Sequence, residues 1–236
     1  MAGPFFDEIP DVALAIYAHP DDAEVAAGGT LALWAANGSA VNVCVCAQGD
    51  KGSLDPAVVP AELASLRKAE SVRAGAVLGV RRRFWLDHPD GELEDGLELR
   101  GQLVSLIRDL RPDVVLAPDP TAVFFGQTYI NHRDHRVTGW AAIDAVVPGA
   151  ANPHYFPGAQ PAHSVGTLLL SGTLEPDVWV DVTTSIDAKA QAVVCHASQI
   201  GDGGDLVMRS VRSRAADAGK RAGTRFAEGF RHVILA

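Results

Sequence analysis

Two clusters of His and Asp side chains carry the residue types that metal-assisted chemistry requires. The first cluster is His19-Pro20-Asp21-Asp22, and the second contains His132, Asp134 and His135. Two imidazoles and one carboxylate with an open coordination position are typical of catalytic zinc, or of another divalent ion that accepts nitrogen and oxygen ligands. The two clusters therefore predict a metal site that activates water.

Each cluster alone also has a purely structural interpretation. Asp21 or Asp22 would cap a helix that begins there, because Asp side chains accept hydrogen bonds at helix N-termini. A cap needs one carboxylate, so a second one beside His19 exceeds that need. His132 and His135 would fit a polar helix start, where residues three apart share a face. The occurrence of both clusters favours the metal site.

The elements that must position these clusters are strands alternating with helices. Strands are expected at residues 12–18, 40–47, 84–86, 113–117, 167–170, 178–182 and 231–235. Helices are expected at residues 24–37, 61–78, 97–110, 137–147, 186–199 and 206–222. This alternation predicts an α/β, Rossmann-like fold, a mostly parallel sheet with helices on both faces. The Pro- and Gly-rich residues 148–163 are expected to form a loop or a lid.

Both clusters follow expected strands, the first directly and the second after a loop. Ligands of such sheets bind outside the carboxyl ends of the strands, so the active site is expected there. The pair Gly28-Gly29 is expected to allow close helix–sheet packing, since no G-x-G-x-x-G motif follows a strand. A nucleotide-dependent oxidoreductase is therefore disfavoured.

The composition narrows the class of protein. A chain of 236 residues with 47% hydrophobic content supports a single domain over residues 1–236 and excludes general disorder. The net charge of -9 argues against nucleic acid or an anionic membrane as partner, and the run Arg81-Arg82-Arg83 is expected to be a solvated edge. Three Cys, no secretory signal and no apolar run of membrane-spanning length favour the cytoplasm.

The clusters and several later motifs resemble one family. Residues 18–24 read AHPDDAE and residues 131–135 read NHRDH, as in the PIG-L-like (LmbE-like) zinc-dependent N-acetylglucosaminyl de-N-acetylases. Further matches, in the family's order, are RKAE at 67–70 running on to LGV at 78–80, PDGEL at 89–93, Lys189 with HASQ at 196–199, and AEGF at 227–230. Ala23 departs from the commonest motif, which has Glu directly after the second Asp. This departure leaves every inferred ligand in place. It affects only the contacts that hold the loop in its conformation.

The resemblance implies roles for the first cluster and its metal. His19, Asp22 and His135 would be the ligands, which agrees with the two His and one Asp inferred from the residues alone. The ion would be Zn²⁺, with another divalent metal such as Fe²⁺ as the alternative. Asp21 would be the general base, taking a proton from the attacking water and passing it to the leaving amine.

The resemblance also implies roles beside the metal. His132 would stabilise the oxyanion as an imidazolium, and Asp134 would hold and tune that ring. Arg67 and Asp90 would contact the sugar of the substrate.

The sequence leaves the roles of the other polar residues open. His88 is expected at the surface, with a contact to substrate as the alternative, and Tyr129 is expected to line the pocket. His196 fits the pocket and the core equally well. His154 and His163 belong to the loop or lid at residues 148–163.

The leading hypothesis is a metal-dependent hydrolase that removes an N-acetyl or related N-acyl group from an amino-sugar-containing small molecule, in thiol or natural-product biosynthesis. The related alternative is an amidase for larger acyl groups of glucosaminyl conjugates, and the size of the acyl pocket decides between them. A non-catalytic sugar-binding protein on the same scaffold is disfavoured, because all catalytic positions are present. A homo-oligomer is compatible with the sequence.

Overall fold

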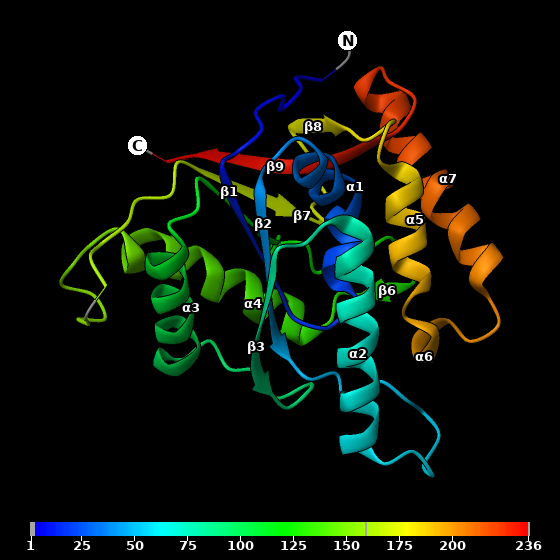
Figure 1. Ribbon diagram of the computed structural model, residues 1–236, viewed down its shortest axis with the longest axis horizontal. Coiled ribbons are helices and arrows are strands. Elements are labelled where there is room, and N and C mark those ends of the chain that lie inside the picture. The colour runs from blue at the N-terminus through cyan, green and yellow to red at the C-terminus, as the bar shows by residue number, and fades with distance from the viewer. Residues whose placement is uncertain (1–2, 159, 236) are drawn as a thin grey trace.

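A seven-stranded sheet forms the centre of the computed structural model, which describes residues 3–158 and 160–235 (Figure 1). The strands lie in the order β3-β2-β1-β4-β7-β9-β8. Neighbours from β3 to β7 pair in parallel, whereas β9 is antiparallel to both β7 and β8. The bounds are β1 Val12–Tyr17, β2 Ala40–Ala47, β3 Arg82–His88, β4 Val114–Pro118, β7 Thr167–Ser171, β8 Val178–Asp181 and β9 Ala227–Ile234.

Helices cover both faces of the sheet, as the expected α/β architecture requires (Figure 1). One side carries α1 (Asp22–Ala36), α2 (Pro60–Leu78) and α5 (Ile186–Val194), with α7 (Gly204–Ala222) packed on α5 and β9. The other side carries α3 (Leu97–Leu110) and α4 (Arg133–Asp144). Among the described residues, no helix is long and apolar enough to span a membrane. That residues 1–236 form a single domain stays a prediction.

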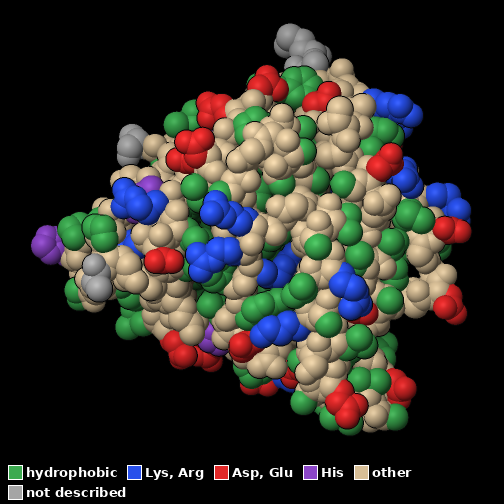
Figure 2. All heavy atoms as spheres, in the orientation of Figure 1, with side chains coloured by type: hydrophobic (Ala, Val, Ile, Leu, Met, Phe, Trp, Pro, Cys, Tyr) green, Lys and Arg blue, Asp and Glu red, His purple; other side chains and the backbone are tan. Residues whose placement is uncertain are grey.

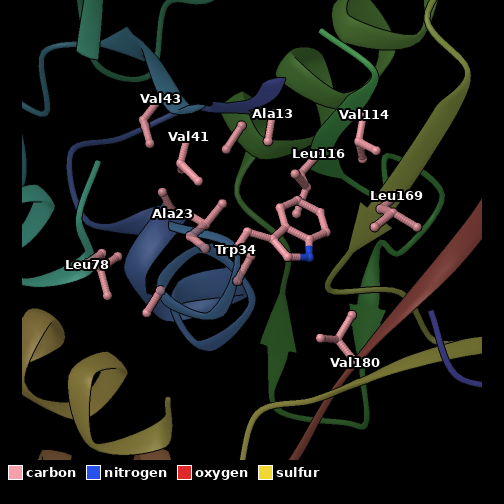
Figure 3. Close-up of a cluster of buried hydrophobic side chains, with 14 of the residues drawn as sticks. Ala13, Ala23, Trp34, Val41, Val43, Leu78, Val114, Leu116, Leu169 and Val180 are labelled. Atoms are coloured by element: carbon pink, nitrogen blue, oxygen red, sulfur yellow. The ribbon is translucent and has the colours of Figure 1, made fainter. Parts of the chain in front are cut away.

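Burial on both faces explains why the first strand is apolar throughout. Ala13, Ala15 and Tyr17 pack towards α1, whereas Leu14 and Ile16 pack towards α3 and α4. Figure 3 shows the indole of Trp34, on α1, in the middle of the buried hydrophobic cluster on that side of the sheet, with side chains of the sheet around it. The labelled residues of this hydrophobic cluster include Val41, Leu116, Leu169 and Val180 as well as Trp34. This packing holds the start of α1 at the carboxyl end of β1.

Helices α1 and α4, which carry residues of the two His/Asp clusters, both begin earlier than the sequence pattern predicts. Helix α1 begins at Asp22, two residues before the expected start. Helix α4 begins at Arg133, four residues early, because the ring of His132 accepts the backbone N–H of Asp134 at the helix start. Polar first turns carry no apolar periodicity, so the pattern detected only the later part of each helix.

The helix expected at residues 186–199 is two helices, α5 and the short α6 (Ala197–Ile200). The break lies at His196, whose backbone is not helical. The Glu70 carboxylate accepts the backbone N–H of Ser198 at 2.8 Å and its hydroxyl at 2.6 Å. This contact with α2 fixes the start of α6, and sequence periodicity cannot reveal it.

Of the loop or lid expected at residues 148–163, the lid alternative is wrong, because residues 148–158 and 160–163 lie at the opposite end of the sheet from the two His/Asp clusters. His163 Nε2 donates to the carbonyl of Pro112, just before β4, at 2.8 Å. Arg108 of α3 donates to carbonyls within this segment, those of Gly149, Ala150, Asn152, Tyr155 and Phe156. The first residues belong to the kinked helical segment Ala145–Ala150, in which the backbone of Val147 is extended. His154 and His163 therefore lie away from the candidate site.

A buried ion pair between Glu24 and Arg83 stabilises the loop that carries the first His/Asp cluster, residues 19–22. Glu24 Oε1 accepts from Arg83 at 2.6 Å, and their side chains are 0% and 6% exposed. Arg83 also donates to Ser71 Oγ, which donates to the carbonyl of Pro20 at 2.6 Å. Burial alone would raise the pKa of Glu24, but His196 and Arg83 outweigh it and lower that pKa. Glu24 thus supports the loop despite the shift of motif at Ala23.

Only part of the Arg81-Arg82-Arg83 run is therefore a solvated edge. Arg81 and Arg82 are exposed, but the guanidinium of Arg83 is buried. Figure 2 shows Lys and Arg side chains over the middle of the displayed face and Asp and Glu nearer its margins. The basic side chains thus lie more centrally on that face than the acidic ones.

Replacing Glu24 with Ala is expected to lower the free energy of unfolding by about 3–5 kcal/mol, because Arg83 would remain buried and charged without its partner. Urea unfolding should show this as a lower midpoint with an unchanged slope. Asp217→Ala removes half of an exposed pair with Lys220 and should leave the midpoint nearly unchanged. Equal midpoints for the Glu24→Ala and wild-type proteins would refute a stabilising role for the buried pair.

Candidate metal centre

The fold brings the two clusters together at the carboxyl edge of the sheet. His19 follows β1, and Asp22 is the first residue of α1. After β4 the chain forms a small hairpin of β5 (Phe124–Phe125) and β6 (Tyr129–Ile130), which the sequence pattern does not predict. The hairpin leads directly into the second cluster at the start of α4.

Three side chains converge with spacings that suit one metal ion. The Nδ1 atom of His19 lies 3.2 Å from Nε2 of His135 and 3.4 Å from Oδ2 of Asp22. Nε2 of His135 lies 3.2 Å from Oδ1 of Asp22. Nitrogen ligands about 2 Å from a tetrahedral zinc ion stand roughly 3.3 Å apart. His19, Asp22 and His135 therefore fit the expected ligand set.

The far nitrogen of each ring is held by a hydrogen-bond acceptor. His135 Nδ1 donates to Asn131 Oδ1 at 3.0 Å, and the amide of Asn131 is itself oriented by a bond from Nδ2 to the carbonyl of Ala122. His19 Nε2 donates to Asp90 Oδ1 at 3.1 Å. An ion beside Asp22 would displace any proton from the two near nitrogens, and these contacts would orient both rings from behind, as in other metal sites.

The charge around His19 also favours a cation. Burial by itself lowers the pKa of His19, but hydrogen bonds to Asp134, Asp22 and Asp90 outweigh it and raise that pKa to about 12. Oδ1 of Asp134 is buried and has no hydrogen-bond partner among the described residues. A second overlapping group, His19, Asp90, His132 and Asp134, also lies within ligand distance. The first set fits better, because its ring nitrogens are oriented from behind.

Asp21 lies beside this set but faces another partner. Its Oδ1 accepts a hydrogen bond from the Arg67 guanidinium at 3.0 Å, and its side chain is 25% exposed. It makes no capping bond to α1. Arg67 is buried and also donates to the carbonyl of Gly49 at 2.9 Å. A Cβ atom at Gly49 or Gly52 would collide with the guanidinium, so this turn leaves room for Arg67.

His132 and Asp134 are arranged differently from the pairing implied by the family resemblance. The carboxylate of Asp134 accepts from the backbone N–H of Gly91 and lies 3.4 Å from His19, whereas only its backbone N–H contacts His132. Burial and the neighbouring His19 lower the pKa of His132. Both observations favour a neutral ring with its proton on Nε2, rather than an imidazolium held by Asp134.

The structure shows where the other polar residues of interest lie relative to the proposed ligands. His88 is half-buried at the end of β3 and pairs with Gln102 at 2.8 Å. His196 is 1% exposed and packs beside Glu24, away from the proposed metal ligands. Tyr129 lines a cavity of about 730 Å³ that begins at Asp22 and His135, and we call it the side cavity. Arg67 and Asp90 are not among the residues that line it.

Asn131 is a functional candidate that sequence reasoning missed. Its only sequence signal is its place directly before His132 in the second cluster. Replacing it with Ala should weaken metal binding about 10–100-fold, because His135 would lose the acceptor that orients it. A competition titration with a metal-chelating dye measures this affinity. Asn37→Ala, at the exposed end of α1, serves as control, and equal affinities in the two variants would exclude a role for Asn131.

Comparison with known proteins identifies the class to which this fold and site belong. The family profile of GlcNAc-PI de-N-acetylase, PIG-L, matches residues 14–146, and the chain belongs to this family. The family resemblance, the fold and the class of enzyme, a de-N-acetylase hydrolase, are thereby confirmed.

Several relatives of the chain are named for a deacetylase activity. Diacetylchitobiose deacetylase of Thermococcus kodakarensis is 34% identical over 233 residues, which are 97% of this chain and 85% of the relative. A 1D-myo-inositol 2-acetamido-2-deoxy-alpha-D-glucopyranoside deacetylase of Mycobacterium sp. (strain KMS) is 27% identical over 84% of this chain and 77% of its own length. The structure of N,N'-diacetylchitobiose deacetylase from Pyrococcus horikoshii, bound to the inhibitor MPG, superposes with a TM-score of 0.86. It is 32% identical over 95% of this chain and 84% of that one.

Proposed function

We propose that this chain is a zinc-dependent hydrolase that removes the acetyl group from an N-acetylated amino sugar within a small molecule. The observation that carries the proposal is the convergence of His19 Nδ1, His135 Nε2 and the Asp22 carboxylate, with both rings oriented from behind. Relatives with 34% and 27% identity are named as deacetylases of acetamido sugars. Two imidazoles and one carboxylate suit Zn²⁺, and Fe²⁺ is the alternative ion with the same ligand preference.

A divalent ion at these ligands would supply an activated water and polarise the amide carbonyl. Asp21 acts as the general base, with the Arg67 guanidinium holding its Oδ1 and its Oδ2 left to accept the proton of the attacking water. The same carboxyl group then returns the proton to the leaving amine. Acetate and a free amino sugar are the products.

Two further residues stabilise the developing oxyanion and bind the substrate. His132 is exposed beside the His19 ring, and the proton on its Nε2 donates to the oxyanion that develops from the amide carbonyl. Asp90 uses Oδ1 to hold His19 and has its second oxygen left to accept a sugar hydroxyl. The contacts of Arg67 favour a role in positioning Asp21 over the sugar contact implied by the resemblance.

An acetate-release screen tests this function. The purified, zinc-loaded chain is incubated with N-acetylglucosamine, N,N'-diacetylchitobiose and glucosamine carrying longer N-acyl chains. We expect acetate and free amine in equal amounts from the acetylated sugars. Release of longer acids without acetate would favour the amidase alternative, and no hydrolysis of any compound would refute the proposal.

A further inference from the structure

Asp90 can orient His19 only if the loop that carries it is held in place. Its Oδ1 accepts from Nε2 of His19 at 3.1 Å, and the loop follows β3. Opposite residues 45–47 of β2, β3 carries one extra residue, and Asp87 there has a left-handed backbone with a φ of 56°. Such an irregularity bends a strand away from its regular path. The pairing of β3 alone therefore does not fix Asp90, and other contacts must do so.

The turn at residues 49–52, which we call the site turn, binds both backbone groups of Asp90. Oδ1 of Asp50 accepts the backbone N–H of Asp90 at 2.8 Å, and Nζ of Lys51 donates to the backbone carbonyl of Asp90 at 2.7 Å. Hydrogen bonds with one ionised partner are stronger than bonds between neutral groups. Asp50 is half-buried and Lys51 is exposed, so the bond from Asp50 is the less screened of the two.

The side chain of Asp50 is not needed to form its own turn. The backbone closes the turn, because the N–H of Gly52 donates to the carbonyl of Gly49 at 3.3 Å. Within residues 3–158 and 160–235, the only hydrogen bond of the Asp50 carboxylate is the one to Asp90. The contact across to the β3 loop is thus the one interaction that this carboxylate makes.

The backbone of the site turn serves the other half of the candidate site. The carbonyl of Gly49 accepts from Arg67, whose guanidinium also binds Asp21. A change to the Asp50 side chain leaves that carbonyl in place. None of residues 49–52 lines the side cavity, so such a change leaves the cavity intact as well. Effects on Asp90 can therefore be separated from effects on Asp21.

We propose that Asp50 is a positioning residue that acts through Asp90. By accepting the backbone N–H of Asp90, it holds one oxygen of that carboxylate against His19 and presents the other to the substrate. It thereby sets the affinity for the metal and the contact with the sugar, and Lys51 contributes less from the carbonyl side. This inference rests on the proposed function, because it takes His19 as a metal ligand.

The test measures zinc affinity by competition with a metal-chelating dye. Asp50→Ala should weaken Zn²⁺ binding about 10-fold, at the lower end of the range for groups behind a ligand, because it acts one step further away. It should also raise KM and leave kcat at saturating zinc nearly unchanged, since Arg67 still holds Asp21. Asp50→Asn removes the same charge but keeps an oxygen acceptor. Restored affinity in Asp50→Asn would therefore separate positioning from simple charge attraction.

A double-mutant cycle distinguishes positioning from a general structural role. In an Asp90→Ala background, Asp50→Ala should change zinc affinity by less than about twofold, because the group through which it acts is gone. Lys51→Met should weaken binding about 2–5-fold and takes the place of Asp50→Ala in the cycle if that variant does not fold. Asp55→Ala is the matched control, since exposed Asp55 accepts the N–H of Ala57 at 2.9 Å in the same loop. Its affinity should equal that of the wild type.

Three results would overturn the inference. They are wild-type zinc affinity in Asp50→Ala, an equal loss with and without Asp90, and no recovery in Asp50→Asn. Failure of the wild type to hydrolyse any acetylated sugar would instead refute the proposed function, which the zinc titration does not measure.

Discussion

Replacing Asp21 with Asn is expected to slow acetate release about 10²–10⁴-fold, equivalent to about 3–5 kcal/mol of barrier, while the metal stays bound. The Asn amide oxygen can still accept from Arg67, so the loop should keep its shape. The amide nitrogen cannot take a proton from water, and this loss falls on kcat. Steady-state kinetics with metal analysis of the same samples separate the two effects.

The neighbouring carboxylate provides the sharpest comparison. Asp22 faces His135, whereas Asp21 faces Arg67, so Asp22→Asn should lose metal and Asp21→Asn should not. Asp87→Asn, at an exposed carboxylate beside Lys68, should change neither property. Loss of metal from Asp21→Asn together with retained activity in Asp22→Asn would show that the two roles are reversed.

Replacing His135 with Ala is expected to remove most of the bound metal and to reduce activity about 10³-fold or more. With only His19 and Asp22 left, the site lacks a third protein ligand and can no longer hold the ion that activates water. The same result is expected for His19→Ala. Metal content and acetate release should fall together in both variants.

His88→Ala is a suitable control, because His88 pairs with Gln102 and contacts no proposed ligand. It should retain both metal and activity. Full metal occupancy in the His135→Ala protein would remove His135 from the ligand set and favour the overlapping group of His19, Asp90, His132 and Asp134.

The parallel sheet and the meeting of the two clusters were predictable from the sequence. Strands buried on both faces appear as continuous apolar runs, such as Val12–Tyr17, and parallel strands place their carboxyl ends at one edge. His19 and His135 each lie close in the chain to an element that the pattern detects. Their approach therefore follows from topology alone.

Other contacts depend on tertiary packing that no local pattern encodes. Arg67 was expected to face the sugar, yet the turn at Gly49 and Gly52 leads its guanidinium to Asp21. Residues 148–163 have the composition of a mobile lid, but a single side chain, Arg108, binds five of their carbonyl groups at the far end of the sheet.

The most direct test of the central claim is a zinc titration of chelator-stripped protein, followed by acetate release from an N-acetylated amino sugar. The stripped chain should be inactive. Activity should rise with added Zn²⁺ and reach its plateau at about one ion per chain, as one set of His19, Asp22 and His135 requires. Activity that persists in the stripped protein, or a plateau only at two ions per chain, would contradict the account.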